Sequence, residues 1–186
     1  MKNQAMFGTF CMGLCVCGLL LAGCSDVEEE RQREAFRQSL IEKAVYDDTR
    51  RLGEAFLKNN AQRSNVIVMA SGLQYRVLKS GKGDVSPTFD QFVVVDYQGR
   101  RVDDYVFDDT IKKGSPSVFP VNKVIRGWQQ ALIKMHIGDQ WELFVPANLA
   151  YGATSPSTDI PANSALIFTV ELLDIQSQDD REQKDK

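Results

Sequence analysis

Residues 124–135, in the second half of the chain, read VIRGWQQALIKM. The large apolar residues Trp128, Leu132 and Met135 recur at spacings of four and three, which places them on one face of a helix. No other stretch between residue 71 and the C-terminus has this periodicity so clearly. The pattern predicts one short helix in this part of the chain.

On both sides of this helix the apolar residues change to a period of two, which is typical of strands. Leu73, Tyr75 and Val77, for example, alternate with polar neighbours, and residues 80–87 that follow contain glycine and proline in a turn pattern. The predicted strands are 73–77, 92–97, 102–108, 141–145 and 165–175, of which the last is the longest. A twisted antiparallel sheet packed over one helix follows, which is an α+β fold.

Five short strings carry a resemblance to a known family. They are VVDYQG at 94–99, VFD at 106–108, VIRGW at 124–128, LAYG at 149–152 and LIFTVELL at 166–173. In this order and spacing they resemble the FKBP-type peptidyl-prolyl cis-trans isomerases, over residues 71–176. The resemblance implies a half-barrel sheet wrapped around one short helix, and isomerase activity toward X-Pro bonds.

The resemblance also implies which side chains line the pocket. The implied catalytic residues are Tyr97, Phe107, Asp108, Trp128, Tyr151 and Phe168, and the implied substrate-binding residues are Phe119, Val124, Ile125 and Ile160. Most of these are apolar or aromatic. Rotation about an X-Pro bond makes and breaks no covalent bond, but it meets a barrier of about 18–20 kcal/mol set by amide resonance. A dry pocket favours the twisted amide, because that form has less charge separation than the planar one.

Each position has an implied role. Trp128 forms the floor under the proline ring, while the Ile125 backbone N–H and the Tyr151 hydroxyl bind peptide carbonyls. Asp108 orients Tyr97 or contacts the twisting carbonyl, without acting as a general acid or base. Taken singly, each large apolar residue is more often a core residue and an aspartate more often a cap, so the joint pattern carries the hypothesis.

The chain departs from the family pattern in two places. Ser117 stands where many members have an aromatic residue, which thins one wall of the pocket, and the loop 154–159 over the pocket is polar. Macrolides of the FK506 or rapamycin type are therefore less firmly expected as ligands than proline-containing polypeptides.

The first 23 residues resemble a bacterial lipoprotein signal peptide. Lys2 precedes an apolar run, and Leu21-Ala22-Gly23-Cys24 ends it with small residues before a cysteine. This predicts removal of residues 1–23, lipidation of Cys24 and a location at the cell envelope, expected at the outer membrane. The alternative is an uncleaved membrane anchor.

Residues 25–70 form a charged segment with apolar residues at helical spacing, such as Phe36 and Leu40. One or two helices are predicted, with a break near residues 47–49 as the alternative to a continuous helix. The segment is either a stalk or a dimerisation arm over residues 26–62, since relatives of the macrophage-infectivity-potentiator-like group pair through a helical N-terminal region. Residues 177–186 are predicted to be a charged, disordered tail.

Composition narrows the remaining possibilities. The chain holds 22 basic and 25 acidic residues, a balance that argues against a nucleic-acid partner. All four cysteines lie at or before Cys24, so no thiolate metal site, disulfide or cofactor is expected downstream, and the single histidine, His136, is not expected to be catalytic. Two functions stay open: an isomerase that assists the folding of exported proteins, and a binding or chaperone module with little isomerase activity.

Overall fold

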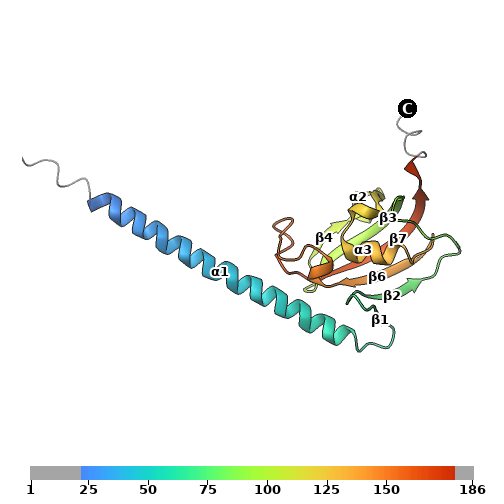
Figure 1. The fold of residues 1–186 in the computed structure, drawn as a ribbon, viewed down its shortest axis with the longest axis horizontal. Helices are drawn as coiled ribbons and strands as arrows, with labels where there is room; N and C mark the ends of the chain where they lie inside the picture. The colour runs from blue at the N-terminus through green and yellow to red at the C-terminus, as the bar shows by residue number, and fades with distance from the viewer. Residues whose placement is uncertain (1–21, 179–186) are drawn as a thin grey trace, which may run out of the picture. The chain divides into compact units, whose positions relative to one another are not determined.

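This computed structural model of the chain describes residues 22–178, except for the side chains of residues 22–26 and 44 (Figure 1). The described residues form two compact units, with the boundary between residues 43 and 44. Residues 1–21, the bulk of the expected signal peptide, lie outside the described residues, as do the Cys24 side chain and residues 179–186 of the expected tail. No helix within the described part of the chain is long and apolar enough to cross a bilayer.

Helix α1 is a single continuous helix from Ala22 to Asn60, so the alternative of two helices is wrong. At the expected break, the Thr49 hydroxyl donates to the Val45 carbonyl within the helix and does not cap a second one. In the second unit the end of α1 is tied to the sheet. Asn60 donates to the Gln74 side chain at 2.9 Å, and the Gln74 amide donates to the Leu57 carbonyl at 2.9 Å.

One antiparallel sheet of seven strands forms the frame of the second unit within the described residues, in the order β1-β2-β6-β7-β3-β4, with β5 also paired to β3. The strands are β1 Ile67–Val68, β2 Gln74–Lys79, β3 Phe92–Arg101, β4 Val106–Asp109, β5 Ser117–Pro120, β6 Gln140–Val145 and β7 Leu166–Gln176. The helices are α2 Thr110–Lys113, α3 Arg126–Leu132 and the 3₁₀ turns η1 Val121–Lys123 and η2 Ala147–Leu149. The predicted α+β architecture is confirmed.

Helix α3 lies against β6 on one face of the sheet (Figure 1). Gly127 permits the close approach, because a Cβ at this position would lie 2.6 Å from the Val145 side chain. The face of α3 turned to the sheet carries Trp128, Ala131 and Leu132, all of them buried in one apolar core with the inward side chains of β3, β6 and β7. The helical spacing read from the sequence therefore identified the buried face.

Several element bounds differ from the prediction. The strand predicted over 102–108 begins only at Val106, because Asp104 takes a left-handed turn conformation with φ 65°. The helix predicted over 124–135 is shorter, since Ile125 is its N-cap and Leu132 its last residue. The short elements β1, β5 and α2 were not predicted.

Candidate functional site

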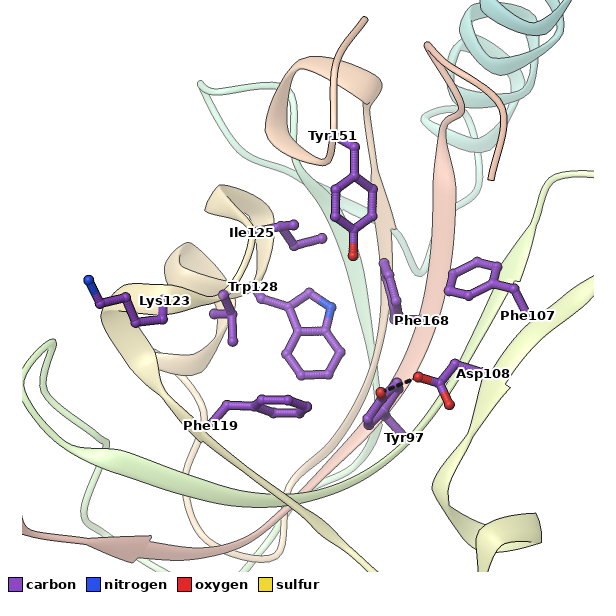
Figure 2. A pocket seen from close by; sticks show the side chains of 10 residues that line it. Tyr97, Phe107, Asp108, Phe119, Lys123, Ile125, Trp128, Tyr151 and Phe168 are labelled. Carbon is purple, nitrogen blue, oxygen red and sulfur yellow. Dashed lines mark hydrogen bonds between the residues drawn. The ribbon is translucent and has the colours of Figure 1, made fainter. Parts of the chain in front are cut away.

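A pocket of about 270 Å³ opens between α3 and the strands β3, β4, β5 and β7 (Figure 2). Nine of the ten residues named from the sequence line it: Tyr97, Phe107, Asp108, Phe119, Val124, Ile125, Trp128, Tyr151 and Phe168. The tenth, Ile160, is buried in the adjoining core instead. Lys123 lines the pocket without having been predicted. Its ammonium points away from the aromatic rings (Figure 2).

Strand register brings the walls together from distant parts of the sequence. Within the sheet, Gly99 of β3 pairs with Asp108 of β4 on one side and with Phe168 of β7 on the other. Gly99 has no side chain, so the rings of Phe107 and Phe168 close over it at a centroid distance of 5.8 Å, in an edge-to-face arrangement. These two rings form one wall of the pocket.

The Trp128 indole is the centre of the pocket. It meets the rings of Tyr97, Phe119 and Phe168 at centroid distances of 5.1, 6.1 and 5.3 Å, with interplanar angles between 85° and 89°. Such edge-to-face contacts fix ring orientation better than aliphatic packing does. The buried indole N–H has no acceptor among the described residues. The result is a rigid apolar cup with an unused donor at its floor.

One carboxylate stands at the rim of this cup. Asp108 accepts a 2.5 Å hydrogen bond from the Tyr97 hydroxyl (Figure 2), another from the Lys113 ammonium and a third from the backbone N–H of Asp109. Burial raises the pKa of the Asp108 carboxyl, but the hydrogen bonds from Lys113 and Tyr97 together outweigh it and hold the pKa below its usual value. Asp108 is therefore an anion at neutral pH, and each of its oxygens already accepts hydrogen bonds.

Two phenols face the same space. The pKa of Tyr97 is raised far above its usual value, first by burial and then by the hydrogen bond to the Asp108 carboxylate. The pKa of Tyr151 is raised by burial and by the nearby charge of Asp108. Both hydroxyls therefore stay protonated at neutral pH. The Tyr97 hydroxyl is engaged with Asp108, whereas the Tyr151 hydroxyl points into the pocket and remains a donor for a ligand (Figure 2).

A backbone donor lies beside these groups. Ile125 is the N-cap of α3, a position whose backbone N–H has no partner within the helix. The apolar side chain of Ile125 itself makes no capping hydrogen bond. A carbonyl bound in the pocket can therefore accept a hydrogen bond from Ile125, as the sequence resemblance implied.

The loop beyond Tyr151 is held in place by contacts with the β3–β4 connection. Tyr105 donates to the Asp159 carboxylate at 3.0 Å, and the Arg101 guanidinium donates to the Asp159 carbonyl at 3.2 Å. The same guanidinium lies 4.7 Å from the centre of the Tyr105 ring. The Ser155 hydroxyl also donates to the Ile160 carbonyl, and the Ile160 side chain is buried in the core where the loop ends.

No group of three or more histidine, cysteine, aspartate or glutamate side chains able to hold a metal ion occurs within residues 22–178. Among the described residues, the polar groups around the pocket are one anionic carboxylate, two phenols, an indole N–H, a backbone N–H and the Lys123 ammonium, which points away from the rings. This set can bind and orient an amide in an apolar environment.

Comparison with known proteins assigns the chain to a family. Residues 83–173 match the FKBP-type peptidyl-prolyl cis-trans isomerases, and residues 21–77 match the domain amino terminal to FKBP-type peptidyl-prolyl isomerase. The macrophage infectivity potentiator of Trypanosoma cruzi is 34% identical over 165 residues, which cover 89% of this chain and 83% of that protein. The chain belongs to the FKBP family of peptidyl-prolyl isomerases.

Other relatives of this FKBP-family chain are longer. It is 44% identical over 124 residues to the peptidyl-prolyl cis-trans isomerase Mip of Coxiella burnetii, covering 67% of this chain, and 41% identical over 130 residues to the outer membrane protein MIP of Legionella longbeachae, covering 70%. The matches span only 54% and 55% of those two proteins, about half their length. The crystal structure of FkpA from Escherichia coli superimposes with a TM-score of 0.72 at 32% identity, over 82% of this chain and 73% of that chain. The FKBP fold expected from the sequence is confirmed.

Proposed function

We propose that the protein is a peptidyl-prolyl cis-trans isomerase whose active site is the pocket around Trp128. The observation that carries this proposal is the aromatic cup itself, with three rings meeting the indole edge-to-face and few polar groups around it. A proline ring needs a flat apolar surface of this kind, and its amide needs only a few fixed hydrogen bonds.

The reaction follows from desolvation and differential binding. A planar X-Pro amide has strong charge separation through resonance, which water stabilises, whereas the twisted amide has lost that resonance. The apolar walls from Tyr97, Phe107 and Phe168 therefore bind the twisted form in preference to either planar isomer. No proton is transferred in the reaction. The charge of Asp108 therefore acts through its hydrogen bonds and its electrostatic field, and Asp108 is not a general acid.

The polar groups fix the position of the substrate. The Ile125 N–H and the Tyr151 hydroxyl bind carbonyl oxygens on either side of the bond, while Asp108 holds the Tyr97 ring in the wall through its 2.5 Å hydrogen bond. Phe119 and Val124 add contact with the proline ring. Ile160 acts from behind as a buried support of the loop that carries Tyr151.

The test is a protease-coupled assay with an Ala-Leu-Pro-Phe type peptide, which reads the rate of cis-to-trans conversion. The protein should accelerate it, and Phe168→Ala should reduce kcat/KM by at least tenfold while circular dichroism stays native. Lack of acceleration by a folded protein would leave the second hypothesis, a polypeptide-binding or chaperone module. Displacement of a fluorescent FK506-type macrolide tests the pocket as a ligand site.

The helical arm favours an additional role in assembly. Phe36, Leu40 and Ile41 expose 66%, 52% and 51% of their surface, although apolar residues of this size are normally buried. We infer that two copies of the chain pair through residues 26–62. These residues belong to an arm, residues 25–70, that precedes the isomerase domain at residues 71–176. Sedimentation of the wild type and of Phe36→Glu, with an Arg37→Glu control on the same helix, tests this.

An envelope location completes the proposal. A relative in Legionella longbeachae carries the name outer membrane protein MIP, and the lipobox-like ending at Cys24 provides the anchor. Removal of residues 1–23 and lipidation of Cys24 would place the domain at the outer membrane, where exported proteins fold. Labelling with radioactive palmitate, lost in Cys24→Ser, tests the anchor.

A further inference from the structure

A second cavity, of about 370 Å³, lies in the second unit between the last turns of α1 and the segments that carry Ala147 and Asn163. It is larger than the aromatic pocket of about 270 Å³. Its volume falls within the range of about 300–1,000 Å³ that ligand sites occupy. No sequence pattern indicated this cavity, because its walls come from segments about 100 residues apart.

The cavity has firm walls. On one side Gly53 of α1 packs so closely against Ala165 that an added Cβ would lie 2.9 Å from the alanine Cβ. The same end of α1 is anchored by the hydrogen bonds with Gln74 and by the Phe56 ring, which lies 6.0 Å from that of Phe144. Because the helix is held at these points, the cavity is not a gap that a small shift of α1 would close.

An unpartnered amide belongs to the opposite wall. Asn163 is 9% exposed, and its side-chain N–H₂ group has no acceptor among the described residues. Its backbone has φ 59°, a left-handed conformation that asparagine tolerates, and its N–H donates to the Gly152 carbonyl at 2.7 Å. A buried donor without a partner is unfavourable. The nitrogen is closed off as the side chain stands, so a ligand carbonyl in the cavity gains this hydrogen bond only when the Asn163 amide rotates toward it.

The charges at the cavity are balanced. Among the described residues that line it, only Arg50 and Glu54 are ionisable, one of each sign, and the others are glycine, alanine, proline, leucine and asparagine. This composition fits neither a phosphate nor a metal cation. It fits a neutral ligand with apolar groups and amide oxygens, which is the chemistry of a polypeptide main chain with an apolar side chain.

Consecutive residues of one loop line the two cavities. Tyr151 lines the aromatic pocket, while the next two residues, Gly152 and Ala153, line the second cavity. The loop at residues 151–153 therefore borders both cavities, and an extended chain that follows it, at about 3.3–3.6 Å per residue, can contact both.

We propose that the second cavity is a subsite for the polypeptide whose X-Pro bond occupies the aromatic pocket. It accepts an apolar side chain a few residues from the proline, with a main-chain carbonyl on the Asn163 amide. The inference rests on the proposed isomerase function, and it adds that substrates longer than four residues bind more tightly than short ones.

The experiment compares two substrates on the full chain by NMR exchange spectroscopy. One is the tetrapeptide Ala-Leu-Pro-Phe, which is too short to reach the subsite; the other is a dodecapeptide with a central Leu-Pro and leucines on both sides. Glu54→Trp fills the cavity from α1, Glu54→Gln removes the charge alone, and Ala55→Trp places the same ring on the neighbouring position that does not line the cavity. Glu54→Trp should raise KM for the dodecapeptide about tenfold at unchanged kcat, and KM for the tetrapeptide less than twofold.

Asn163→Asp keeps the size and the left-handed tendency of the residue but lacks the N–H donor, so it should raise the dodecapeptide KM about threefold. The proposal is overturned if Glu54→Trp affects both peptides equally or neither, or if Ala55→Trp has the same effect. If the wild type accelerates neither peptide, the isomerase proposal fails by itself. Fluorescence anisotropy with a labelled dodecapeptide then decides the subsite: binding weakened by Glu54→Trp alone supports it, and equal binding by all variants overturns it.

Discussion

The absence of a side chain at Gly99 is a condition for the aromatic wall, and Gly99→Ala tests it. An alanine Cβ would lie 2.6 and 2.7 Å from two carbons of the Phe107 ring and 3.0 Å from the Phe168 ring. Ordinary contacts begin at 3.4 Å, so the Phe107 ring must move by about 0.8 Å and the Phe168 ring by about half of that. Both rings face the pocket, so the shift changes its shape.

The expected costs in stability and in activity differ. Overpacking typically costs about 1–3 kcal/mol, and the half-buried Phe107 ring can yield toward solvent, so we expect about 1 kcal/mol. That corresponds to a decrease in Tm of roughly 2–4 °C for a chain of this size. A misplacement of about 1 Å at a reacting group can reduce turnover about a hundredfold, so kcat/KM should fall by roughly ten- to a hundredfold.

The protease-coupled assay gives kcat/KM, and thermal unfolding followed by circular dichroism gives Tm. The matched control is the double variant Gly99→Ala with Phe107→Ala, in which the clash with the Phe107 ring is absent. Relative to Phe107→Ala alone, the added alanine should then cost little stability. Full activity of Gly99→Ala, or the same loss of stability in both backgrounds, would refute the account of the wall.

Three further predictions follow from the polar contacts. Tyr97→Phe removes the hydrogen bond to Asp108 and should lower kcat/KM by about three- to tenfold with little change in KM, measured in the same assay. The folded-state pKa of the Asp108 carboxyl is lowered, so Asp108 keeps its stabilising charge above about pH 4 and loses it only at lower pH. The pKa of the Tyr97 phenol is raised, so it ionises only above about pH 10. We therefore expect kcat/KM to be constant between about pH 5 and pH 9, and a bell-shaped profile in this range would contradict the mechanism. Glu142→Ala removes the buried carboxylate that Arg76 and Arg100 share. We expect the free energy of unfolding, measured in urea, to fall by about 2 kcal/mol. This loss is smaller than for a fully buried ion pair, because both guanidinium groups are partly exposed.

The parts of the fold that the sequence predicted are those with a strong local period. Trp128, Leu132 and Met135 repeat at helical spacing, and all three are buried in the core of the second unit. The alternation around β2 and β6 was only partly right. Leu73, Leu143 and Val145 are fully buried as expected, but Val77 is 44% exposed, and Glu142 and Phe144 on the other side of β6 are buried as well. A period can be read from the sequence where one face of an element meets the core and the other does not, as on α3. Both faces of β6 are covered, so its alternation did not reveal the buried Phe144.

The short elements show no such periodicity in the sequence. Strand β5 has four residues and ends in a proline, and helix α2 has four residues between Asp109 and Gly114, too few for either period to show. The start of β4 was predicted too early in the sequence. The turn at Asp104 depends on a left-handed backbone conformation, and the neighbouring residues contain no pattern that predicts it. Such features are set by pairing with distant strands and not by local propensity.

The pocket residues were found through a family resemblance, and its limits show at two positions. Ile160 was expected in the pocket but is buried beside it in the core, next to its isolated bridge with Ser157. Lys123 was not predicted to line the pocket, because its exposed position follows no helical or strand period. Its place directly before Val124 and Ile125 is the one feature of the sequence that could have indicated it as a lining residue. The second cavity depends on how α1 packs against residues near 147 and 163, and no local pattern contains that information.

The pocket exists because β3 changes its partner halfway along one edge. Its residues 92–95 pair with β5 and its residues 98–100 pair with β4, while β7 follows the opposite edge throughout. At the change-over the fully buried Thr110 takes the place of a strand: its hydroxyl accepts from the Tyr97 N–H at 2.9 Å and donates to the Asp96 carboxylate at 2.8 Å. A continuous strand there would have satisfied the same backbone N–H and closed the edge of the sheet. The hydroxyl satisfies it instead, so β4 and β5 diverge on either side of Tyr97, and the space between them is the hollow in which Trp128 forms the floor.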